Sequence, residues 1–145
     1  MYSKILIIGG GLIGSSIARA ARRLAEVMVI TDADVGARGA LERLGIADAV
    51  AENAADHADA ELVVLCVPPG AMVSAAQDVV PRLSPGAVVT DVGSLKGSVI
   101  RDVAPLVPEG VHFIPGHPIA GTEHSGPEAG FAELFRGRWG RRRCR

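Results

Sequence analysis

The stretch that decides the fold is Lys4-Ile5-Leu6-Ile7-Ile8-Gly9-Gly10-Gly11-Leu12-Ile13-Gly14. Its apolar half predicts a strand buried on both faces, as in a parallel sheet covered by helices. The glycines that follow have the spacing Gly9-x-Gly11-x-x-Gly14 and precede a helical pattern. Gly9 allows a tight turn, Gly11 lets backbone approach a pyrophosphate, and Gly14 lets the helix pack closely on the sheet. The stretch therefore predicts a dinucleotide-binding turn.

Strand-like and helical patterns alternate along the rest of the chain. We expect strands at 27–31, 49–51, 61–67, 87–91 and 111–115. We expect helices at 12–24, from Asp34 to Leu44, and at 53–60, 71–83 and 96–106. This order predicts an α/β fold with a doubly wound, mainly parallel Rossmann-type sheet and right-handed crossovers.

Two of these helices have a distinct apolar face that should pack on the sheet. In the first helix the face consists of Ile13, Ile17, Ala20, Ala21 and Leu24. In the helix at 71–83 it consists of Met72, Ala76, Val79 and Val80.

The carboxyl ends of the strands are where such sheets bind their ligands. The residues that we assign there to cofactor binding are Gly9, Gly11, Leu12, Ile13, Gly14, Asp32, Val67 and Pro68.

Asp32 ends the second strand, about 20 residues after the glycine turn, where dinucleotide folds place the carboxylate that accepts the ribose hydroxyls. The alternative is that Asp32 or Asp34 only caps the next helix. We assign ribose binding to Asp32 and the cap to Asp34. A carboxylate there repels a 2′-phosphate, so NAD is the expected cofactor and NADP is disfavoured. Arg38, one turn into the helix, is the residue that could instead bind a 2′-phosphate and favour NADP.

The stretch Asp91-Val92-Gly93-Ser94-Leu95-Lys96 leaves the strand at 87–91 on the same side. The hydroxyl of Ser94 has two interpretations of equal weight from the residues alone. It either caps the following helix or faces the nicotinamide end of the site.

A polar loop, Gly116-His117-Pro118-Ile119-Ala120-Gly121-Thr122-Glu123-His124-Ser125-Gly126, follows the strand at 111–115. His117 stands beside the expected crevice and precedes a rigid proline, which favours acid/base chemistry over a purely structural role. We interpret His112, inside the strand, as structural, and His124 as a residue of the rim or a hydrogen-bonding residue.

Composition excludes several classes of function. Six of the 15 basic residues lie at 136–145, so residues 1–135 carry 9 basic against 16 acidic groups, a net charge of −7 that disfavours nucleic-acid binding. Neither a membrane span nor a signal peptide is expected, since no run of 18 apolar residues exists and the first strand begins at once. Cys66 and Cys144 lack metal-ligand spacing, so no metal is expected. Cys66 fits a small buried apolar residue in a reducing, cytoplasmic compartment.

The glycine turn continued by Ser15-Ser16, the stretch 91–96, and above all Gly116-His117-Pro118-Ile119-Ala120-Gly121-Thr122-Glu123 resemble the prephenate dehydrogenase family. This family includes arogenate and cyclohexadienyl dehydrogenases of tyrosine biosynthesis. The resemblance covers about residues 4–139 and implies an NAD-dependent oxidative decarboxylation of a small molecule, prephenate or arogenate. His117 matches the catalytic histidine and Ser94 the serine that helps to place it. Thr122 and Glu123 match loop residues near the substrate, and Lys96 matches the motif without an assigned role.

The end of the chain departs from the family. Relatives continue into a helical domain that dimerises and supplies cations for the substrate carboxylates, whereas this chain reads Gly140-Arg141-Arg142-Arg143-Cys144-Arg145. We expect one dinucleotide-binding domain at 1–139, truncated before the helical domain, and an anomalous basic tail at 140–145. The tail fits out-of-frame translation or truncation, with a nucleic-acid-binding arm as the minor alternative.

Two functions of different classes follow. The first is a prephenate or arogenate dehydrogenase domain, expected to be inactive as this chain. The second is a dinucleotide-binding or sensing module without catalysis.

Overall fold

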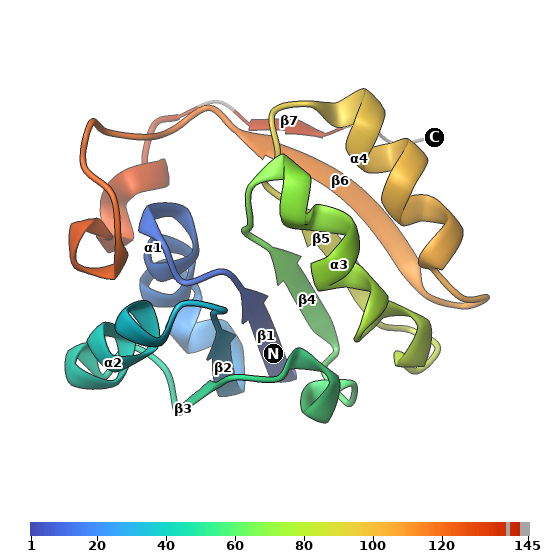
Figure 1. Ribbon diagram of the computed structural model, residues 1–145, viewed down its shortest axis with the longest axis horizontal. Coiled ribbons are helices and arrows are strands. Elements are labelled where there is room, and N and C mark those ends of the chain that lie inside the picture. Colours follow the sequence, from blue (N-terminus) through green and yellow to red (C-terminus); the bar gives the residue numbers. More distant parts are fainter. Residues whose placement is uncertain (139, 143–145) are drawn as a thin grey trace.

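The computed structural model describes residues 1–138 and 140–142. Within them, seven strands form one sheet in the order β3-β2-β1-β4-β5-β6-β7 (Figure 1). The strands are β1 (Tyr2–Ile8), β2 (Ala25–Thr31), β3 (Ala49–Ala51), β4 (Leu62–Leu65), β5 (Val88–Asp91), β6 (His112–Pro118) and β7 (Gly140–Arg142). All neighbours from β3 to β6 are parallel, and β7 is antiparallel to β6. The predicted doubly wound, mainly parallel sheet is confirmed.

Four α-helices connect the strands of the described chain: α1 (Leu12–Ala21), α2 (Val35–Leu44), α3 (Met72–Gln77) and α4 (Lys96–Val103). Figure 1 shows α1 and α2 at the β1–β3 end of the sheet and α3 and α4 at the β4–β6 end. Short 3-10 helices fill the remaining connections, at Arg22–Leu24, Ala54–His57, Pro69–Ala71, Val80–Arg82, Ala104–Leu106, Pro127–Ala129 and Ala132–Phe135.

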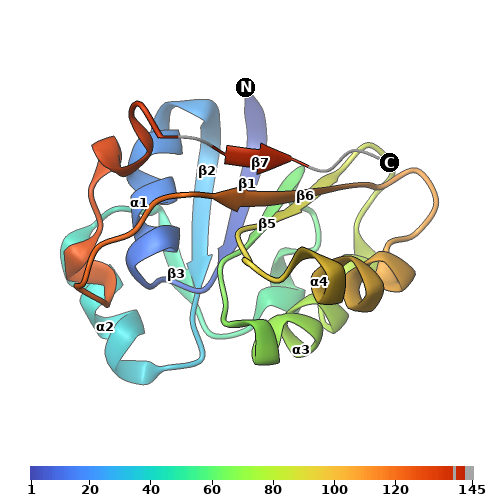
Figure 2. The ribbon, with the colours of Figure 1, turned by 90° about the horizontal axis from the view of Figure 1, so that it is seen from above.

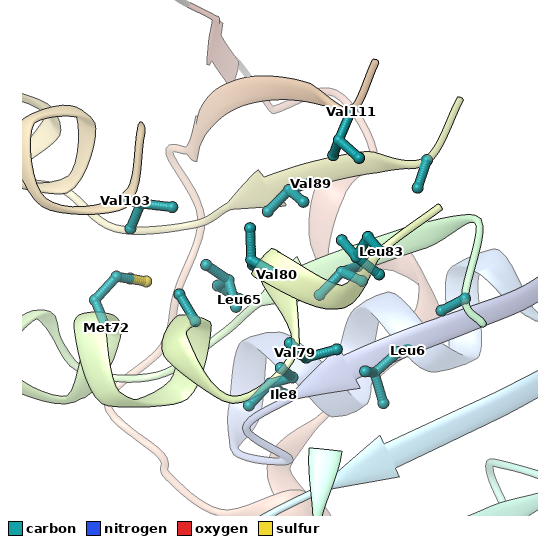
Figure 3. Close-up of a cluster of buried hydrophobic side chains, with 14 of the residues drawn as sticks. Leu6, Ile8, Leu65, Met72, Val79, Val80, Leu83, Val89, Val103 and Val111 are labelled. Atoms are coloured by element: carbon teal, nitrogen blue, oxygen red, sulfur yellow. The ribbon is translucent and has the colours of Figure 1, made fainter. Parts of the chain in front are cut away.

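Alternate side chains of the strands build two apolar layers, one on each face of the sheet. On the face of α1 and α2, Ile5, Ile7 and Ile30 pack with Leu41. On the other face, Leu6, Ile8 and their neighbours in β4 and β5 pack against α3 and α4 (Figure 3). The predicted inward residues Met72, Ala76, Val79 and Val80 all belong to this second layer and are buried, as expected.

The first helix differs from its prediction. It ends at Ala21 instead of Leu24, Ala20 is exposed and Leu24 is 55% exposed. The buried residues of α1 are the small ones, Gly14, Ser15, Ser16 and Ala18. Small side chains face inward because α1 is covered twice, by the sheet and by the segment 127–135.

Contacts between α1 and the segment 127–135 are close. The backbone N–H of Phe131 donates to Oγ of Ser16 at 3.1 Å. A Cβ added to Gly130 would come within 2.1 Å of Oγ of Ser15, so only glycine fits against this serine. Figure 2 shows this orange-red segment leaving β6, passing α2 and α1, and returning toward β7.

Prolines shorten two other predicted helices. The helix predicted at 71–83 is regular only over α3 and resumes as the 3-10 helix Val80–Arg82, which contains Pro81. The helix predicted at 96–106 likewise changes to a 3-10 helix at Ala104–Leu106, which contains Pro105. Proline has no N–H to donate to the carbonyl four residues earlier, so the α-helical ladder stops before it.

The end of β6 is also different from its prediction. The strand was expected at 111–115 with a loop from Gly116, but it extends through His117 to Pro118. Three residues of the predicted basic tail form β7, which pairs Gly116, His117 and Pro118 with 142, 141 and 140. Trp139 and the rest of the predicted tail, Cys144 included, lie outside the described residues.

Candidate functional site

A cleft of about 730 Å³ opens at the carboxyl edge of the sheet. Its walls come from the residues that follow β1, β2, β4 and β5, together with the turn after β3 and the start of α3. Predicted cofactor residues that line it are Gly9, Gly11, Leu12, Ile13, Asp32, Val67 and Pro68, and Ser94 lines it as well. Among the described lining residues, Asp32, Glu52 and Asp78 are carboxylates and none is a lysine or arginine.

The glycine turn has the geometry of a backbone cradle. Gly9 has a φ of +100°, and a Cβ there would lie 2.4 Å from the carbonyl oxygen of Cys66. Gly14 lies beneath the turn rather than in the cleft lining, and a Cβ there would lie 1.9 Å from the carbonyl oxygen of Gly9. Gly11 lines the cleft with nothing within 4 Å of its Cβ position. Two glycines are thus required by packing, and the third leaves space for a ligand.

The first turn of α1 offers free backbone donors to that space. Its N-cap residue is Gly11, which has no side chain to accept a hydrogen bond, and the first turn has no acidic residue. Helix N-termini with unpaired N–H groups bind phosphate groups. The residues present therefore fit a pyrophosphate.

Asp32 is fixed in place by two backbone groups. Its Oδ2 accepts from the N–H of Gly10 at 2.7 Å, and its Oδ1 accepts from the N–H of Asp34 at 2.9 Å. Each carboxylate oxygen has a second lone pair that can accept a ribose hydroxyl. Asp32 thus both holds the glycine turn and presents its charge to the cleft.

The neighbouring polar groups complete this end of the cleft. Oδ2 of Asp34 accepts from the N–H of Ala37 at 2.6 Å and caps α2, as predicted. The hydroxyl of Thr31 is buried, belongs to a residue that lines the cleft, and has no hydrogen-bond partner in the described part of the chain. An unpaired buried hydroxyl is costly, so its place in the lining fits a polar ligand.

Asp91 is the most buried ionisable group of the site, with 1% of its surface exposed. Its Oδ2 pairs with Nζ of Lys96 and accepts from the N–H of Gly93 at 2.8 Å. Its Oδ1 accepts from the N–H of Gly116 at 3.2 Å. One carboxylate therefore joins the loop of Ser94 to the β6 residue that precedes His117. Lys96, which matched the motif without a role, is the counter-ion that makes this burial possible.

Gly116 is required for this junction. A Cβ there would come within 2.8 Å of the carbonyl oxygen of Asp91. The sequence indicated the motif at 91–96 but not this function of Asp91, because its partner in β6 is far away in the chain. The signal in the sequence that could have indicated this function is an aspartate at the end of an apolar strand, followed five residues later by a lysine.

Ser94 does not cap α4. The residue at the cap position is Leu95, and no side chain caps the helix. Ser94 itself is exposed and lines the cleft. The capping interpretation is therefore wrong, and the hydroxyl is free to meet a ligand within the described part of the molecule.

The predicted residues of the His117 segment lie outside the described lining of the cleft. His117 is half-buried in β6, and no hydrogen bond joins it to Ser94 within the described chain. Thr122 and Glu123 are exposed on the following loop. His124 has its Nε2 at 3.6 Å from Oε1 of Glu123, and its N–H donates to Oγ1 of Thr122. His112 lies in β6 as expected and is exposed.

Cys66 lies between the glycine turn and the cleft. Cys66 was predicted to be a small buried residue, but it is half-buried and lines the cleft. Desolvation raises the pKa of the Cys66 thiol well above its usual range, and the charge of Asp91 raises it further. The thiol is therefore protonated and poorly nucleophilic at neutral pH.

Two kinds of feature are missing from residues 1–138 and 140–142. No helix there combines the length and apolar character needed to cross a bilayer. No cluster of three His, Cys, Asp or Glu side chains there could hold a metal ion.

A family model described as "Prephenate dehydrogenase, nucleotide-binding domain" matches residues 17–139. The chain belongs to this family. The match begins just after the glycine turn and includes Asp32, Asp91, Ser94 and His117.

Curated relatives of the prephenate dehydrogenase family match most of the chain. A cyclohexadienyl dehydrogenase of Zymomonas mobilis is 40% identical over 93% of this chain and 47% of its own length. A prephenate dehydrogenase of Lactococcus lactis is 34% identical over 91% of this chain and 38% of its own length. The chain thus spans less than half the length of these relatives.

Solved structures of the family share the fold. A prephenate dehydrogenase of Aquifex aeolicus, in complex with hydroxyphenyl propionate and NAD⁺, superposes with a TM-score of 0.89 and 30% identity, over 99% of this chain and 51% of that chain. An arogenate dehydrogenase of Synechocystis has a TM-score of 0.84 and 28% identity, over 94% of this chain and 48% of that chain.

Proposed function

We propose that this chain is the NAD-binding part, residues 1–139, of a prephenate or arogenate dehydrogenase. The reaction is the oxidative decarboxylation that serves tyrosine biosynthesis. The observation that carries the proposal is the carboxylate of Asp91, which joins the loop of Ser94 to the strand of His117 at the edge of the nucleotide cleft. Family membership and the NAD⁺ complex of the Aquifex relative support it.

The chain's part in cofactor binding follows from the cleft. The free N–H groups at the start of α1 and the open face of Gly11 receive the pyrophosphate. Asp32 accepts the hydroxyls of the adenosine ribose, with its geometry fixed by Gly10 and Asp34. NAD, once bound, supplies the acceptor for the hydride.

The chain's part in the chemistry is proton transfer and orientation. Hydride leaves the ring carbon that bears the substrate hydroxyl, so that hydroxyl must lose its proton as it becomes a carbonyl. The neutral imidazole of His117 accepts this proton, and the hydroxyl of Ser94 orients the substrate hydroxyl beside it. The bond between the ring and its carboxylate then breaks and carbon dioxide leaves. The electron pair of that bond completes the aromatic ring, the carbonyl oxygen becomes a phenolate, and the proton held by His117 returns to it. We assign Thr122 and Glu123 to the substrate side of the same site.

The cleft lacks positive side chains that could bind an anionic substrate, as far as its described lining shows. Prephenate carries two carboxylates, and the described lining of the cleft has three carboxylates and no lysine or arginine. We therefore propose that cations from a further helical domain hold the substrate, that dimerisation occurs through that domain, and that this chain alone has no turnover. A cytoplasmic location belongs to the same proposal.

The alternative is a dinucleotide-binding or sensing module without catalysis. It is favoured by the position of His117, Thr122 and Glu123 outside the described lining of the cleft. The test is an NAD titration of the chain, followed by turnover assays with prephenate and arogenate. The assays use residues 1–139 joined to the C-terminal half of the Zymomonas cyclohexadienyl dehydrogenase. Turnover by the chimera supports the dehydrogenase, whereas tight NAD binding with no turnover by a folded chimera supports the sensor.

A further inference from the structure

Arg38 lies beside the ribose end of the cleft but is directed at the backbone behind it. Its Nη1 donates to the carbonyl oxygens of Asp32 at 2.7 Å and Ala33 at 3.1 Å. Its Nη2 lies 3.6 Å from Oε2 of Glu52, and its side chain is only 15% exposed. Asp32, Ala33 and Glu52 all line the cleft, and Arg38 is absent from its described lining.

The position of Arg38 matters for the choice of cofactor. An arginine one turn into the helix after the second strand is well placed to bind a 2′-phosphate, which would favour NADP. Here Nη1 donates to two carbonyl groups that belong to the ribose loop itself, and Nη2 faces the carboxylate of Glu52. The charges that do face the cleft near Asp32 are negative.

We propose that Glu52 and the carbonyl groups of Asp32 and Ala33 form a specificity lock, which withholds Arg38 from a 2′-phosphate and keeps the site selective for NAD. The proposal rests on the proposed function, because it places the adenosine ribose at Asp32. A 2′-phosphate entering the site meets the carboxylates of Asp32 and Glu52 without access to the guanidinium. Selectivity thus depends on what restrains the arginine as well as on Asp32.

Glu52 is the part of the lock that can be removed at low cost to the fold. Its side chain is 82% exposed. Arg38 keeps its two carbonyl partners without Glu52, whose carboxylate is solvated and 3.6 Å away, so Glu52→Gln should lower the melting temperature only slightly. Glu42→Gln, on the exposed face of α2, is the matched control for loss of one negative charge.

The experiment compares 5′-AMP with 2′,5′-ADP, which differ only by the 2′-phosphate, by calorimetric titration of the whole chain. Wild type should bind 5′-AMP better, and Glu52→Gln should improve the relative affinity for 2′,5′-ADP about threefold to tenfold. Asp32→Ser combined with Glu52→Gln should improve it about a hundredfold, since two repulsive charges are removed and Nη2 of Arg38 no longer faces Glu52. Glu42→Gln should leave the ratio unchanged.

Arg38→Gln supplies the decisive comparison. In wild type it should not change the ratio, because the guanidinium is withheld. In the Asp32→Ser, Glu52→Gln background, Arg38→Gln should lower the relative affinity for 2′,5′-ADP by at least about tenfold. A change of net charge alone would have the same effect in both backgrounds, so this difference would show that Arg38 contacts the 2′-phosphate only in the variant. Equal effects of Arg38→Gln in both backgrounds, or no effect of Glu52→Gln on the ratio, would overturn the lock while leaving NAD binding intact. A wild type that binds neither 5′-AMP nor NAD overturns the proposed function and the lock together.

Discussion

The buried carboxylate of Asp91 accepts a hydrogen bond from the backbone N–H of Gly116 at 3.2 Å. Through this contact the end of β5 is fixed to the residue immediately before His117. Lys96 and the N–H of Gly93 occupy the other oxygen of the same carboxylate. The Asp91 side chain therefore adds to the backbone pairing of β5 with β6 in fixing the relative position of Ser94 and His117.

Asp91→Asn should be strongly destabilising. The amide keeps the shape of the side chain but leaves Lys96, whose side chain is 15% exposed, without its counter-ion. Removal of one partner of a buried pair costs about 3–5 kcal/mol. Urea unfolding measures the loss, and Asp91→Asn with Lys96→Met should recover part of it. Asp102→Asn, which breaks an exposed pair with Arg101, is the control and should have no measurable effect. An Asp91→Asn variant as stable as wild type would contradict the junction.

Gly11→Ala and Gly14→Ala should have opposite consequences. The Cβ position of Gly11 is open, so alanine there should change the free energy of unfolding by less than about 0.5 kcal/mol. The same methyl group occupies the space proposed for the pyrophosphate, so NAD affinity should fall about tenfold or more. Alanine at Gly14 meets a carbonyl oxygen at 1.9 Å and should cost about 1–3 kcal/mol of stability. Equal melting temperatures for the two variants would refute this assignment of roles.

Asp32→Ala should weaken NAD binding by about 1.5–3 kcal/mol, roughly tenfold or more, since a charge-assisted partner of the ribose is lost. The N–H of Gly10 loses its acceptor in the same variant, so the glycine turn should also loosen. Asp34→Ala is the control, because it removes the cap of α2, worth about 1 kcal/mol, without removing the ribose carboxylate. Equal affinity of wild type for NAD and NADP would remove Asp32 from this role.

His117→Asn, made in the chimera with a family C-terminal half, should lower turnover about 10²–10⁴-fold. The amide keeps much of the shape but cannot take the substrate proton. NAD affinity and melting temperature are measured beside turnover. If turnover falls only as far as the lowered melting temperature explains, His117 has a structural role in β6 and not a catalytic one.

The thiol of Cys66 should react slowly with iodoacetamide at pH 8, because burial raises its pKa. In a Cys144→Ser background, NAD should slow the reaction further by covering the cleft.

The raised pKa of Cys66 also makes the free energy of unfolding depend on pH, and the direction follows from proton binding. Above the ordinary thiol pKa, about 8.5, the folded state retains a proton that the unfolded state releases. The contribution to stability is thus complete below about pH 8.5 and declines as pH rises further. Alkylation as fast as that of a free cysteine would contradict the raised pKa of the Cys66 thiol.

Local signals predicted much of the fold. The apolar strand before Gly9, the cap at Asp34 and the inward face of α3 each depend on residues within one or two turns of each other. Pro81 and Pro105 also carried a local signal, since each interrupts a helical ladder, and their effect on the two predicted helices was missed.

The errors have non-local causes. Ala20 and Leu24 were predicted to be buried because an apolar face was counted on α1 alone. The actual buried face is set by Ser15 and Ser16, which pack against residues more than a hundred positions later. Similarly, β6 extends past Pro115 because β7 pairs with it, and the restraint of Arg38 requires Glu52 from another element. No spacing within one element could indicate these contacts.

The hydrogen bond from the N–H of Phe131 to Oγ of Ser16 also affects the order in which parts of the chain can pack during synthesis. The glycine turn and α1 leave the ribosome first, yet the surface that α1 buries against residues 127–135 cannot be covered until those residues emerge. At about 5–20 residues per second, synthesis of the 115 residues from Ser16 to Phe131 takes roughly 6–23 seconds, during which the small-residue face of α1 is uncovered. The helix that starts the nucleotide site is thus encoded more than a hundred codons before the segment that covers it, and nascent chains that end before residue 131 should leave this face of α1 exposed.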